Sequence, residues 1–363
     1  MKIAFFGSSL VSAYWNGAAT YYRGLLRALA GRGHDITFYE PDAFERQQHR
    51  DIDDPDWARV VVYDATETAV IEVLRDARAA DVIVKASGVG VFDELLAEAV
   101  IEARRPGALA VYWDVDAPAT LDLLRREPHD PFVALIPDYD LVFTYGGGER
   151  VVAEYLSHGA RACVPIYNAL DPETHYPVAP QPRLAADLSF VGNRLPDREA
   201  RVGAFFLEAA RLLPKRRFLL GGSGWQDCAL PANINAIGHV YTGQHNALNC
   251  SALAVLNINR ESMADFGFSP PTRVFEAAGA GACLITDAWP GIELFLEPGE
   301  EVLIAADGAE VAALLDALTP DRAQRMGAAA RRRIRARHTY AERARVVEET
   351  LTCARADADM VPQ

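Results

Sequence analysis

Arg273 and Glu276 are the residues whose types and spacing first indicate ligand chemistry. Side chains three positions apart share one face of a helix, so a guanidinium and a carboxylate can address the same molecule. Arginine pairs with phosphate, and a carboxylate accepts hydrogen bonds from hydroxyl groups. Ser269, Pro270 and Pro271 precede them, and we expect Ser269 to cap a helix whose free N–H groups receive a diphosphate. An exposed ion pair between Arg273 and Glu276 is the alternative.

Other polar residues follow predicted strands in the C-terminal half of the chain. Arg194 and Arg198 follow the strand predicted at 186–193, where two cations suit a leaving group that gains negative charge. The alternative for Arg198 is a solvated pair with Asp197 or Glu199. The remaining candidates on this side are Gly222 in the turn GGSG, Asn259 and Arg260 at a strand end, and Thr272 at the predicted helix start.

Two carboxylates mark the first half of the chain. Asp114 and Asp116 are two positions apart at a predicted strand end, so they share a face if the strand persists. Because neighbouring carboxylates disfavour joint ionisation, we expect this pair to be catalytic, with Asp114 as general base on a substrate hydroxyl. The alternative for Asp116 is a helix N-cap. Asn16 and Gly17 precede the first helix and are expected to approach a phosphate or sugar.

Strands and helices alternate along the chain, which is typical of an α/β fold with parallel sheets. The proline-rich stretch 168–184 lacks periodicity and predicts a linker. We therefore expect two Rossmann-like, doubly wound domains, 1–167 and 185–338, facing across a cleft, and a C-terminal helix in 339–363 that packs back on the first domain. The predicted strands are 2–7, 35–40, 81–88, 108–116, 139–146, 161–167, 186–193, 217–223, 252–259, 283–287 and 301–305.

Composition excludes several classes of partner. The 363 residues carry 36 Lys and Arg against 50 Asp and Glu, a net charge of −14 that repels nucleic acid and anionic membranes. The five cysteines are dispersed without a C-x-x-C pair, which favours a reducing cytoplasm and no structural zinc. No stretch is apolar enough to predict a membrane span. A dinucleotide site is disfavoured because Gly7 is followed by Ser8 and Ser9 rather than by G-x-x-G.

Three segments resemble a known enzyme class. The stretch 29–40, LAGRGHDITFYE, is similar to the opening of GT-B glycosyltransferases, and NALDPETHYP at 168–177 resembles their crossing motif N-G-V-D-x-x-x-F-x-P. The most specific match is 273–305, RVFEAAGAGACLITDAWPGIELFLEPGEEVLIA, which resembles their donor-binding block and in detail the branch of the spore maturation protein CgeB. The resemblance implies a GT-B fold whose first domain faces the acceptor and whose second binds a nucleotide sugar.

The resemblance also implies roles for individual residues. Glu276 corresponds to the carboxylate that binds the ribose, and the segment 234–243 to the place that holds the base, so His239 and Tyr241 are base-pocket candidates. Retaining members carry a second Glu eight positions earlier, where this chain has Phe268. Asp265 and Glu261 are nearby acids that a longer loop could bring into that role.

These observations predict a metal-independent glycosyltransferase that moves a sugar from a nucleoside-diphosphate sugar, as co-substrate, to an acceptor nucleophile. We expect no cofactor, no bound metal, no nucleic-acid partner and no integral membrane segment, with a cytoplasmic location. Two alternatives stay open: a UDP-sugar 2-epimerase-like enzyme of the same fold, and a sugar-nucleotide-binding protein without turnover. The sequence leaves the acceptor, the stereochemistry and the oligomeric state open.

Overall fold

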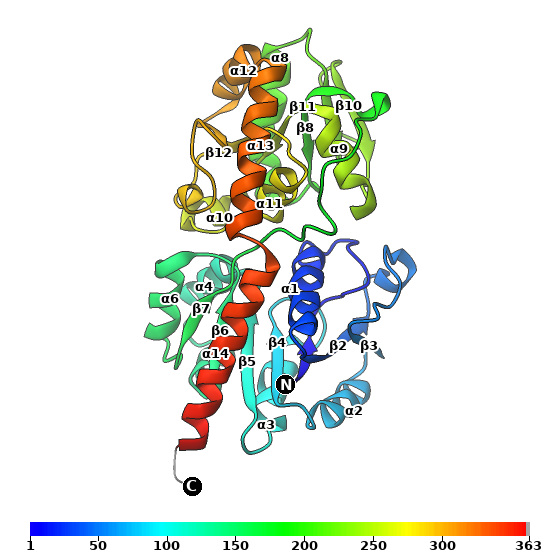
Figure 1. The fold of residues 1–363 in the computed structure, drawn as a ribbon. Coiled ribbons are helices and arrows are strands. Elements are labelled where there is room, and N and C mark those ends of the chain that lie inside the picture. The colour runs from blue at the N-terminus through cyan, green and yellow to red at the C-terminus, as the bar shows by residue number, and fades with distance from the viewer. Residues whose placement is uncertain (361–363) are drawn as a thin grey trace. The chain divides into compact units, whose positions relative to one another are not determined.

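The computed structural model describes residues 1–360, with the side chains of Asp197 and residues 357–360 outside the description. The chain forms two compact units (Figure 1). The first unit contains Met1–Tyr167 and the segment from Tyr340 onward, and the second contains Asn168–Thr339. The proline-rich stretch 168–184 therefore belongs to the second unit rather than standing apart.

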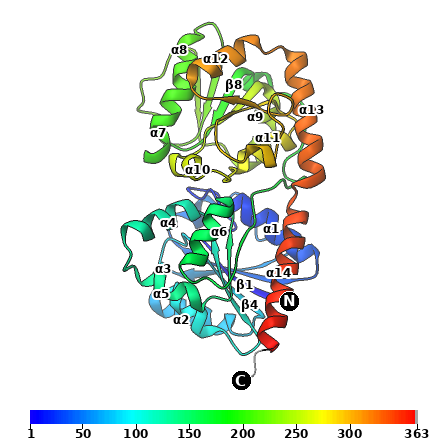
Figure 2. The same cartoon turned by 90° about the vertical axis from the view of Figure 1, so that its left-hand side faces the viewer.

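The first unit is built on a seven-stranded parallel sheet in the order β3-β2-β1-β4-β5-β6-β7. This order is that of a doubly wound fold, in which the carboxyl ends of all strands meet at one edge. The central strands are buried along their whole length because helices cover both faces (Figure 2). The strands are β1 (Lys2–Phe6), β2 (Asp35–Asp42), β3 (Arg59–Asp64), β4 (Val82–Ala86), β5 (Leu109–Asp114), β6 (Leu141–Thr144) and β7 (Cys163–Pro165).

The helices of the first unit include one that arrives from the C-terminal end of the chain. Helix α14 (Tyr340–Met360) packs against α1 (Ala19–Gly31), with Tyr340 buried beside Tyr21. The other α-helices of this unit are α2 (Glu67–Ala77), α3 (Asp93–Ala103), α4 (Ala117–Arg126), α5 (Pro131–Leu135) and α6 (Gly148–Ser157).

The second unit holds a six-stranded parallel sheet in the order β10-β9-β8-β11-β12-β13. Its core joins side chains of the central strands to apolar faces of the flanking helices, for example Phe190 to Phe206 and Phe206 to Phe218. The strands are β8 (Ala186–Val191), β9 (Phe218–Gly221), β10 (Ile234–Gly238), β11 (Ala252–Asn257), β12 (Leu284–Asp287) and β13 (Leu303–Ala305). The helices are α7 (Pro196–Val202), a π-helical turn at Gly203–Leu207, α8 (Glu208–Leu212), α9 (His245–Ser251), α10 (Glu261–Phe266), α11 (Thr272–Gly279), α12 (Gly308–Ala317) and α13 (Pro320–Arg337).

The expected α/β class with two parallel sheets is confirmed. Strands β3 and β10 were not predicted, and both lie at a sheet edge where most positions are partly or fully exposed. An edge strand buries too little to need a continuous apolar run, so its sequence signal is weak. Among the described residues, none of the helices combines the length and apolarity that crossing a bilayer requires.

Candidate functional site

Glycines bring two strand ends of the second unit into direct contact. Gly222 follows β9 with φ +121°, and a Cβ placed there would lie 2.2 Å from the carbonyl oxygen of Gly192, which follows β8. The same carbonyl accepts a hydrogen bond from Trp225 Nε1 at 2.8 Å. Gly222 is therefore required by backbone packing at the carboxyl edge of the sheet.

The two predicted cations lie beside these glycines. Arg198 extends its guanidinium towards Gly192, where a Cβ would stand 3.1 Å from Nη1. The backbone N–H of Arg194 donates to the Ser223 carbonyl at 2.9 Å, which ties the two loops together. The Arg194 side chain pairs with Glu199 at 2.6 Å and is 36% exposed. The expected ion pair with Glu199 is thus formed by Arg194. A pair between Arg198 and Asp197 would involve the Asp197 side chain, which is outside the description.

The base-pocket candidates follow the neighbouring edge strand β10. The backbone N–H of Gly222 donates to the Gly238 carbonyl at 2.6 Å, so the two turns are adjacent. His239 and Tyr241 then stand with their rings edge to face, 4.4 Å apart between centroids, and Tyr241 is largely exposed. The turn that precedes this aromatic pair therefore lies beside Gly222.

Asn259 and Arg260 follow β11, and a buried polar network joins Asn259 to β12. The backbone N–H of Asn259 donates to Asp287, which also receives Nη2 of Arg201 at 2.6 Å. Burial raises the pKa of the Asp287 carboxyl, and the Arg201 guanidinium opposes that rise. The side-chain Nδ2 of Asn259 is buried without a hydrogen-bond partner among the described residues. Arg260 is half-buried at the N-cap position of α10.

Helix α11 begins later than expected, which corrects the role of Ser269. The N-cap is Pro271, no side chain caps the helix, and Ser269 Oγ donates to the Gly267 carbonyl instead. A residue before proline is sterically pushed out of the helical region, so neither Ser269 nor Pro270 can start the helix. The first helical residues are therefore Thr272 and Arg273, both half-buried.

Arg273 keeps its charged group without a partner. No hydrogen bond or ion pair joins its guanidinium to another of the described residues. Burial lowers its pKa while the nearby Glu276 raises it. The expected alternative, an exposed Arg273–Glu276 ion pair, is not formed, so the guanidinium is available to an anion.

Glu276 is buried one turn further along α11, and two histidines flank it. Its Oε1 lies 3.9 Å from Nε2 of His175, and its Oε2 lies 3.6 Å from Nδ1 of His245. Burial by itself would raise the pKa of Glu276, but the charges of the two imidazoles and of Arg273 hold it well below its ordinary value. The carboxylate is therefore ionised. The sequence did not indicate either histidine as a site residue, because they come from separate segments.

In the first unit the structure corrects the role of Asp114. Its exposed fraction is 0%, and its Oδ1 accepts hydrogen bonds from Ser87 Oγ at 2.8 Å, the Asp116 N–H at 3.0 Å and Thr120 Oγ1 at 3.1 Å. Oδ2 accepts the hydroxyl of Tyr155. A carboxylate enclosed by four donors cannot reach a substrate hydroxyl, so Asp114 organises the strand-end loops rather than acting as general base.

Asp116 occupies the N-cap position of α4, but its side chain makes no capping hydrogen bond. Its backbone N–H donates to Asp114 Oδ1 at 3.0 Å. The strand β5 ends at Asp114, and the alternation that would place both side chains on one face ends with it.

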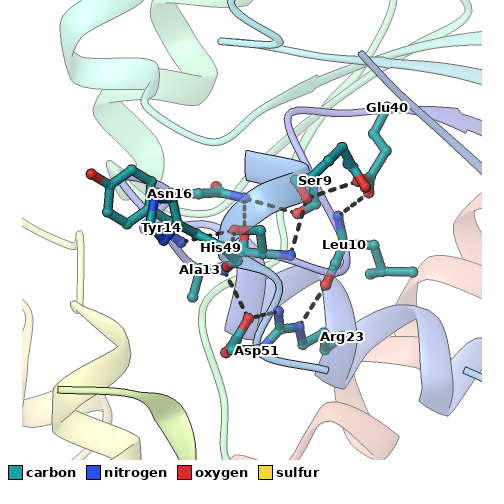
Figure 3. A network of polar contacts seen from close by, with 11 residues as sticks. Ser9, Leu10, Ala13, Tyr14, Asn16, Arg23, Glu40, His49 and Asp51 are labelled. Carbon is teal, nitrogen blue, oxygen red and sulfur yellow. Dashed lines mark hydrogen bonds and ion pairs between the residues drawn. The ribbon is translucent and has the colours of Figure 1, made fainter. Parts of the chain in front are cut away.

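The loop between β1 and α1 is held by a dense polar network (Figure 3). Glu40 at the end of β2 accepts Ser9 Oγ at 2.9 Å and the Leu10 N–H at 2.6 Å, and Asp51 pairs with Arg23 at 2.7 Å. Asn16 serves the same loop, because Nδ2 donates to the carbonyls of Ser9 and Ser12 and Oδ1 accepts from Ser8.

Asn16 is therefore a structural residue of this loop, which corrects the expected ligand contact. All of its side-chain groups already have partners within the loop. Gly17 is exposed, and a Cβ there would meet nothing within 4 Å. Packing within the protein therefore does not require a glycine at this position.

Comparisons with known proteins agree with this fold. Residues 198–349 match the family model described as glycosyl transferase-like. No curated protein matches the chain. The fold is similar to sucrose-phosphate synthase from Thermosynechococcus elongatus, with a TM-score of 0.70, 15% identity, and coverage of 98% of this chain and 100% of that one. It is also similar to the Anabaena protein HepE in complex with UDP and glucose, with a TM-score of 0.67, 16% identity, and coverage of 97% and 100%.

A third similar structure is a glycosyltransferase from Rickettsia africae, with a TM-score of 0.64, 11% identity, and coverage of 97% of this chain and 98% of that one. Two parallel sheets of seven and six strands, each doubly wound, define the GT-B fold in this chain. The glycosyl transferase-like match falls mostly on the second unit, which carries Arg198, Arg273 and Glu276.

Proposed function

We propose that this protein is a glycosyltransferase that moves a sugar from a nucleoside-diphosphate sugar to an acceptor nucleophile, without a divalent metal in the transfer step. The observation that carries the proposal is helix α11, which presents an unpartnered Arg273 guanidinium and, three positions on, the buried and ionised Glu276. The first suits a phosphate and the second suits the two hydroxyls of a ribose.

The chemistry of the transfer explains why cations gather here. The bond between the anomeric carbon and the diphosphate oxygen breaks, and its electron pair leaves with the nucleoside diphosphate. The acceptor oxygen forms the new bond to the anomeric carbon, and its proton passes to the departing diphosphate or to water. Arg273 and Arg198, with the free N–H groups at the start of α11, oppose the charge on the leaving group. Preorganised cations of this kind replace the role that Mg²⁺ has in other transferases.

The proposed donor nucleotide is UDP. Structures of HepE contain UDP and UDP-glucose, and that protein covers almost the whole of this chain. In this chain the base would lie beside Gly222, His239 and Tyr241, where the exposed Tyr241 ring offers a stacking surface. We propose further that the chain belongs to the CgeB-like branch, because residues 273–305 resemble the donor-binding block of that branch. We also propose that it acts in the cytoplasm, where its five free cysteines would stay reduced.

The first experiment measures nucleotide binding by calorimetry with UDP, GDP, ADP and NAD, in EDTA and again with Mg²⁺. We expect UDP to bind in both buffers. Glu276→Gln and Arg273→Gln each remove a charge-assisted hydrogen bond, so UDP affinity should fall by about 10- to 100-fold. Glu300→Gln, an exposed position of the same unit, is the matched control and should bind as wild type. Equal affinity in all four proteins would contradict the donor site.

A second experiment separates transfer from the two alternatives. UDP-sugars are incubated with and without a panel of sugar acceptors, and both free UDP and the sugar products are measured. Transfer predicts UDP release that depends on an acceptor, together with a new glycoside. Acceptor-independent UDP release with an altered free sugar would indicate an epimerase, and tight UDP binding without any product from the panel would indicate a binding protein.

A further inference from the structure

Three side chains of the second unit converge with the geometry of metal ligands. His175 lies in the segment before β8, His245 begins α9, and Glu276 lies in α11. The carboxylate oxygens lie 3.9 Å from Nε2 of His175 and 3.6 Å from Nδ1 of His245, and all three ligand atoms lie within 4.8 Å of one another. None of these distances is a hydrogen bond, so the three groups face a shared space.

The two imidazole nitrogens are buried and lack hydrogen-bond partners. Nε2 of His175 and Nδ1 of His245 are enclosed, and neither finds a donor or acceptor among the described residues. His175 as a whole is 4% exposed. A buried polar atom without a partner costs free energy, so a native structure normally supplies one. Two imidazole nitrogens and a carboxylate that lie within 4.8 Å of one another can be satisfied together by a cation.

We propose that His175, His245 and Glu276 bind a divalent transition-metal ion of the Zn²⁺ type, and that this ion competes with the nucleotide for Glu276. The donor set decides the class of ion, because two imidazoles and one carboxylate suit Zn²⁺, Co²⁺ or Ni²⁺, whereas Mg²⁺ and Ca²⁺ take oxygen ligands. A tetrahedral zinc site holds its ligand atoms about 3.4 Å apart. The distances of 3.9 Å to Oε1 and 3.6 Å to Oε2, and the bound of 4.8 Å on all three pairs of ligand atoms, mean that the side chains must move closer together to bind the ion.

The charges around the cluster permit a divalent ion. Arg273 is the cation that acts on both His175 and Glu276, and it opposes metal binding. The negative charge of Asp171 has the opposite electrostatic effect on His175 to that of Arg273. The Asp171 carboxylate accepts a hydrogen bond from Thr174 Oγ1 at 2.7 Å, which holds it in place. The two carboxylates of Glu276 and Asp171 therefore outnumber the one fixed cation beside them.

His175 is one of three positions at which this chain departs from the crossing motif N-G-V-D-x-x-x-F-x-P, and the motif has Phe there. A buried phenyl ring would fill this place and leave no ligand atom. The substitution His175→Phe is therefore a variant that removes the ligand while keeping the bulk of the ring.

The metal ion and the nucleotide are expected to compete because both would bind the Glu276 carboxylate. This second part rests on the proposed function, in which Glu276 accepts the ribose hydroxyls. A metal ion bound to Glu276 occupies the lone pairs that the hydroxyls need, so each ligand excludes the other. At a Zn²⁺ concentration ten times its Kd, the apparent Kd for UDP should rise about elevenfold.

The binding experiment is a Co²⁺ titration of the full chain without a polyhistidine tag, followed by visible absorption. Wild type should show the d–d bands of a four- or five-coordinate Co²⁺ site at one equivalent. His175→Phe and His245→Gln should each weaken binding at least tenfold, and His129→Gln, an exposed position of the first unit, should bind as wild type. Absence of these bands in wild type would overturn the site, and so would equal binding by folded His175→Phe.

The competition experiment adds UDP to the Co²⁺ complex and, in reverse, measures UDP affinity with Zn²⁺ present. We expect UDP to abolish the bands, and Zn²⁺ to weaken UDP binding to wild type but not to His175→Phe. A nucleoside diphosphate that does not bind the protein controls for chelation in solution. Bands that persist at saturating UDP would overturn the competition. Co²⁺ binding without any UDP binding would instead leave the metal site standing and contradict the proposed function.

Discussion

Asp114 and Glu276 are both buried carboxylates, yet their neighbours give them different tasks. Asp114 receives three hydroxyls and one backbone N–H, which use both of its oxygens. Glu276 has two imidazoles nearby at distances too long for hydrogen bonds, so its oxygens remain open to a ligand. The role of a buried carboxylate is therefore decided by which donors already occupy it.

Replacing Asp114 by Asn tests its structural role. The amide keeps the shape but loses the charge, and it turns one acceptor into a donor that faces Tyr155. We expect the free energy of unfolding to fall by about 1–3 kcal/mol, measured by urea denaturation. Asp122→Asn, at an exposed position of α4, should change it by less than about 0.5 kcal/mol. Unchanged stability of Asp114→Asn together with lost transfer would restore Asp114 as the base.

His175 predicts a dependence of stability on pH. Burial lowers its pKa below the ordinary value, so the folded state resists protonation while the unfolded chain takes up the proton near pH 6.5. Stability is therefore full above pH 6.5 and declines as the pH falls below it, by at most about 1.4 kcal/mol per pH unit for this one group.

His175→Phe removes that contribution, so it should lose less stability than wild type between pH 7.5 and pH 5.5. Urea unfolding at several pH values, with the metal chelated, measures the difference. Histidines remote from His175 are common to both proteins and cancel in the comparison, whereas His245 and Glu276 interact with His175 and belong to the measured difference. Parallel curves for wild type and variant would show that burial does not shift the His175 pKa.

At the scale of elements, the carboxyl edge of the second sheet depends on backbone contacts that side chains would block. The turn after β9 lies against the turn after β8, with Gly222 facing the Gly192 carbonyl. Prolines set the next boundary, because Pro270 and Pro271 delay the start of α11 until Thr272. Arg273 and Glu276 consequently lie in the first two turns of the helix.

Gly222→Ala should destabilise the second unit and weaken UDP binding. The added Cβ meets the Gly192 carbonyl, and the backbone has a positive φ, which together cost about 1–3 kcal/mol. Thermal unfolding and UDP calorimetry measure the two effects. Gly203→Ala is the matched control, since a Cβ there meets nothing within 4 Å and its φ is not positive. A neutral Gly222→Ala would mean that the two turns are not in contact.

At the scale of the whole molecule, the first unit is completed by a helix from the other end of the chain. Helix α14 packs on α1, and at Gly24 the contact is so close that a Cβ would lie 2.1 Å from Cδ2 of Tyr340. Tyr340 is buried there beside Tyr21. The fold of residues 1–167 therefore includes residues that follow the second unit in sequence.

Gly24→Ala should loosen this helix pairing. The methyl group overlaps the Tyr340 ring, so α14 must shift, and we expect a loss of about 1–3 kcal/mol in stability and faster amide hydrogen exchange in α14. Gly31→Ala, at the end of the same helix with nothing within 4 Å, is the control. Exchange in α14 that does not differ between the two variants would contradict close packing at Gly24.

The amino-acid sequence by itself determined the α/β class and most strands of both sheets, and it predicts the segment 269–276 as a place for an anion and a carboxylate. Such features are local. Apolar runs, proline pairs and a spacing of three residues on a helix depend on neighbouring residues and not on the tertiary fold. The edge strands β3 and β10 escaped prediction because shallow burial leaves no apolar run.

Tertiary structure alone decided which polar groups are already in use. Asp114 and Asn16 looked available in sequence, but residues far along the chain supply Asp114 with donors, and a folded loop satisfies Asn16. His175 and His245 gave no local signal, because 70 positions separate them and only the folded second unit brings both to Glu276. Burial and hydrogen-bond partnership depend on the whole fold, so no spacing rule along the chain predicts them.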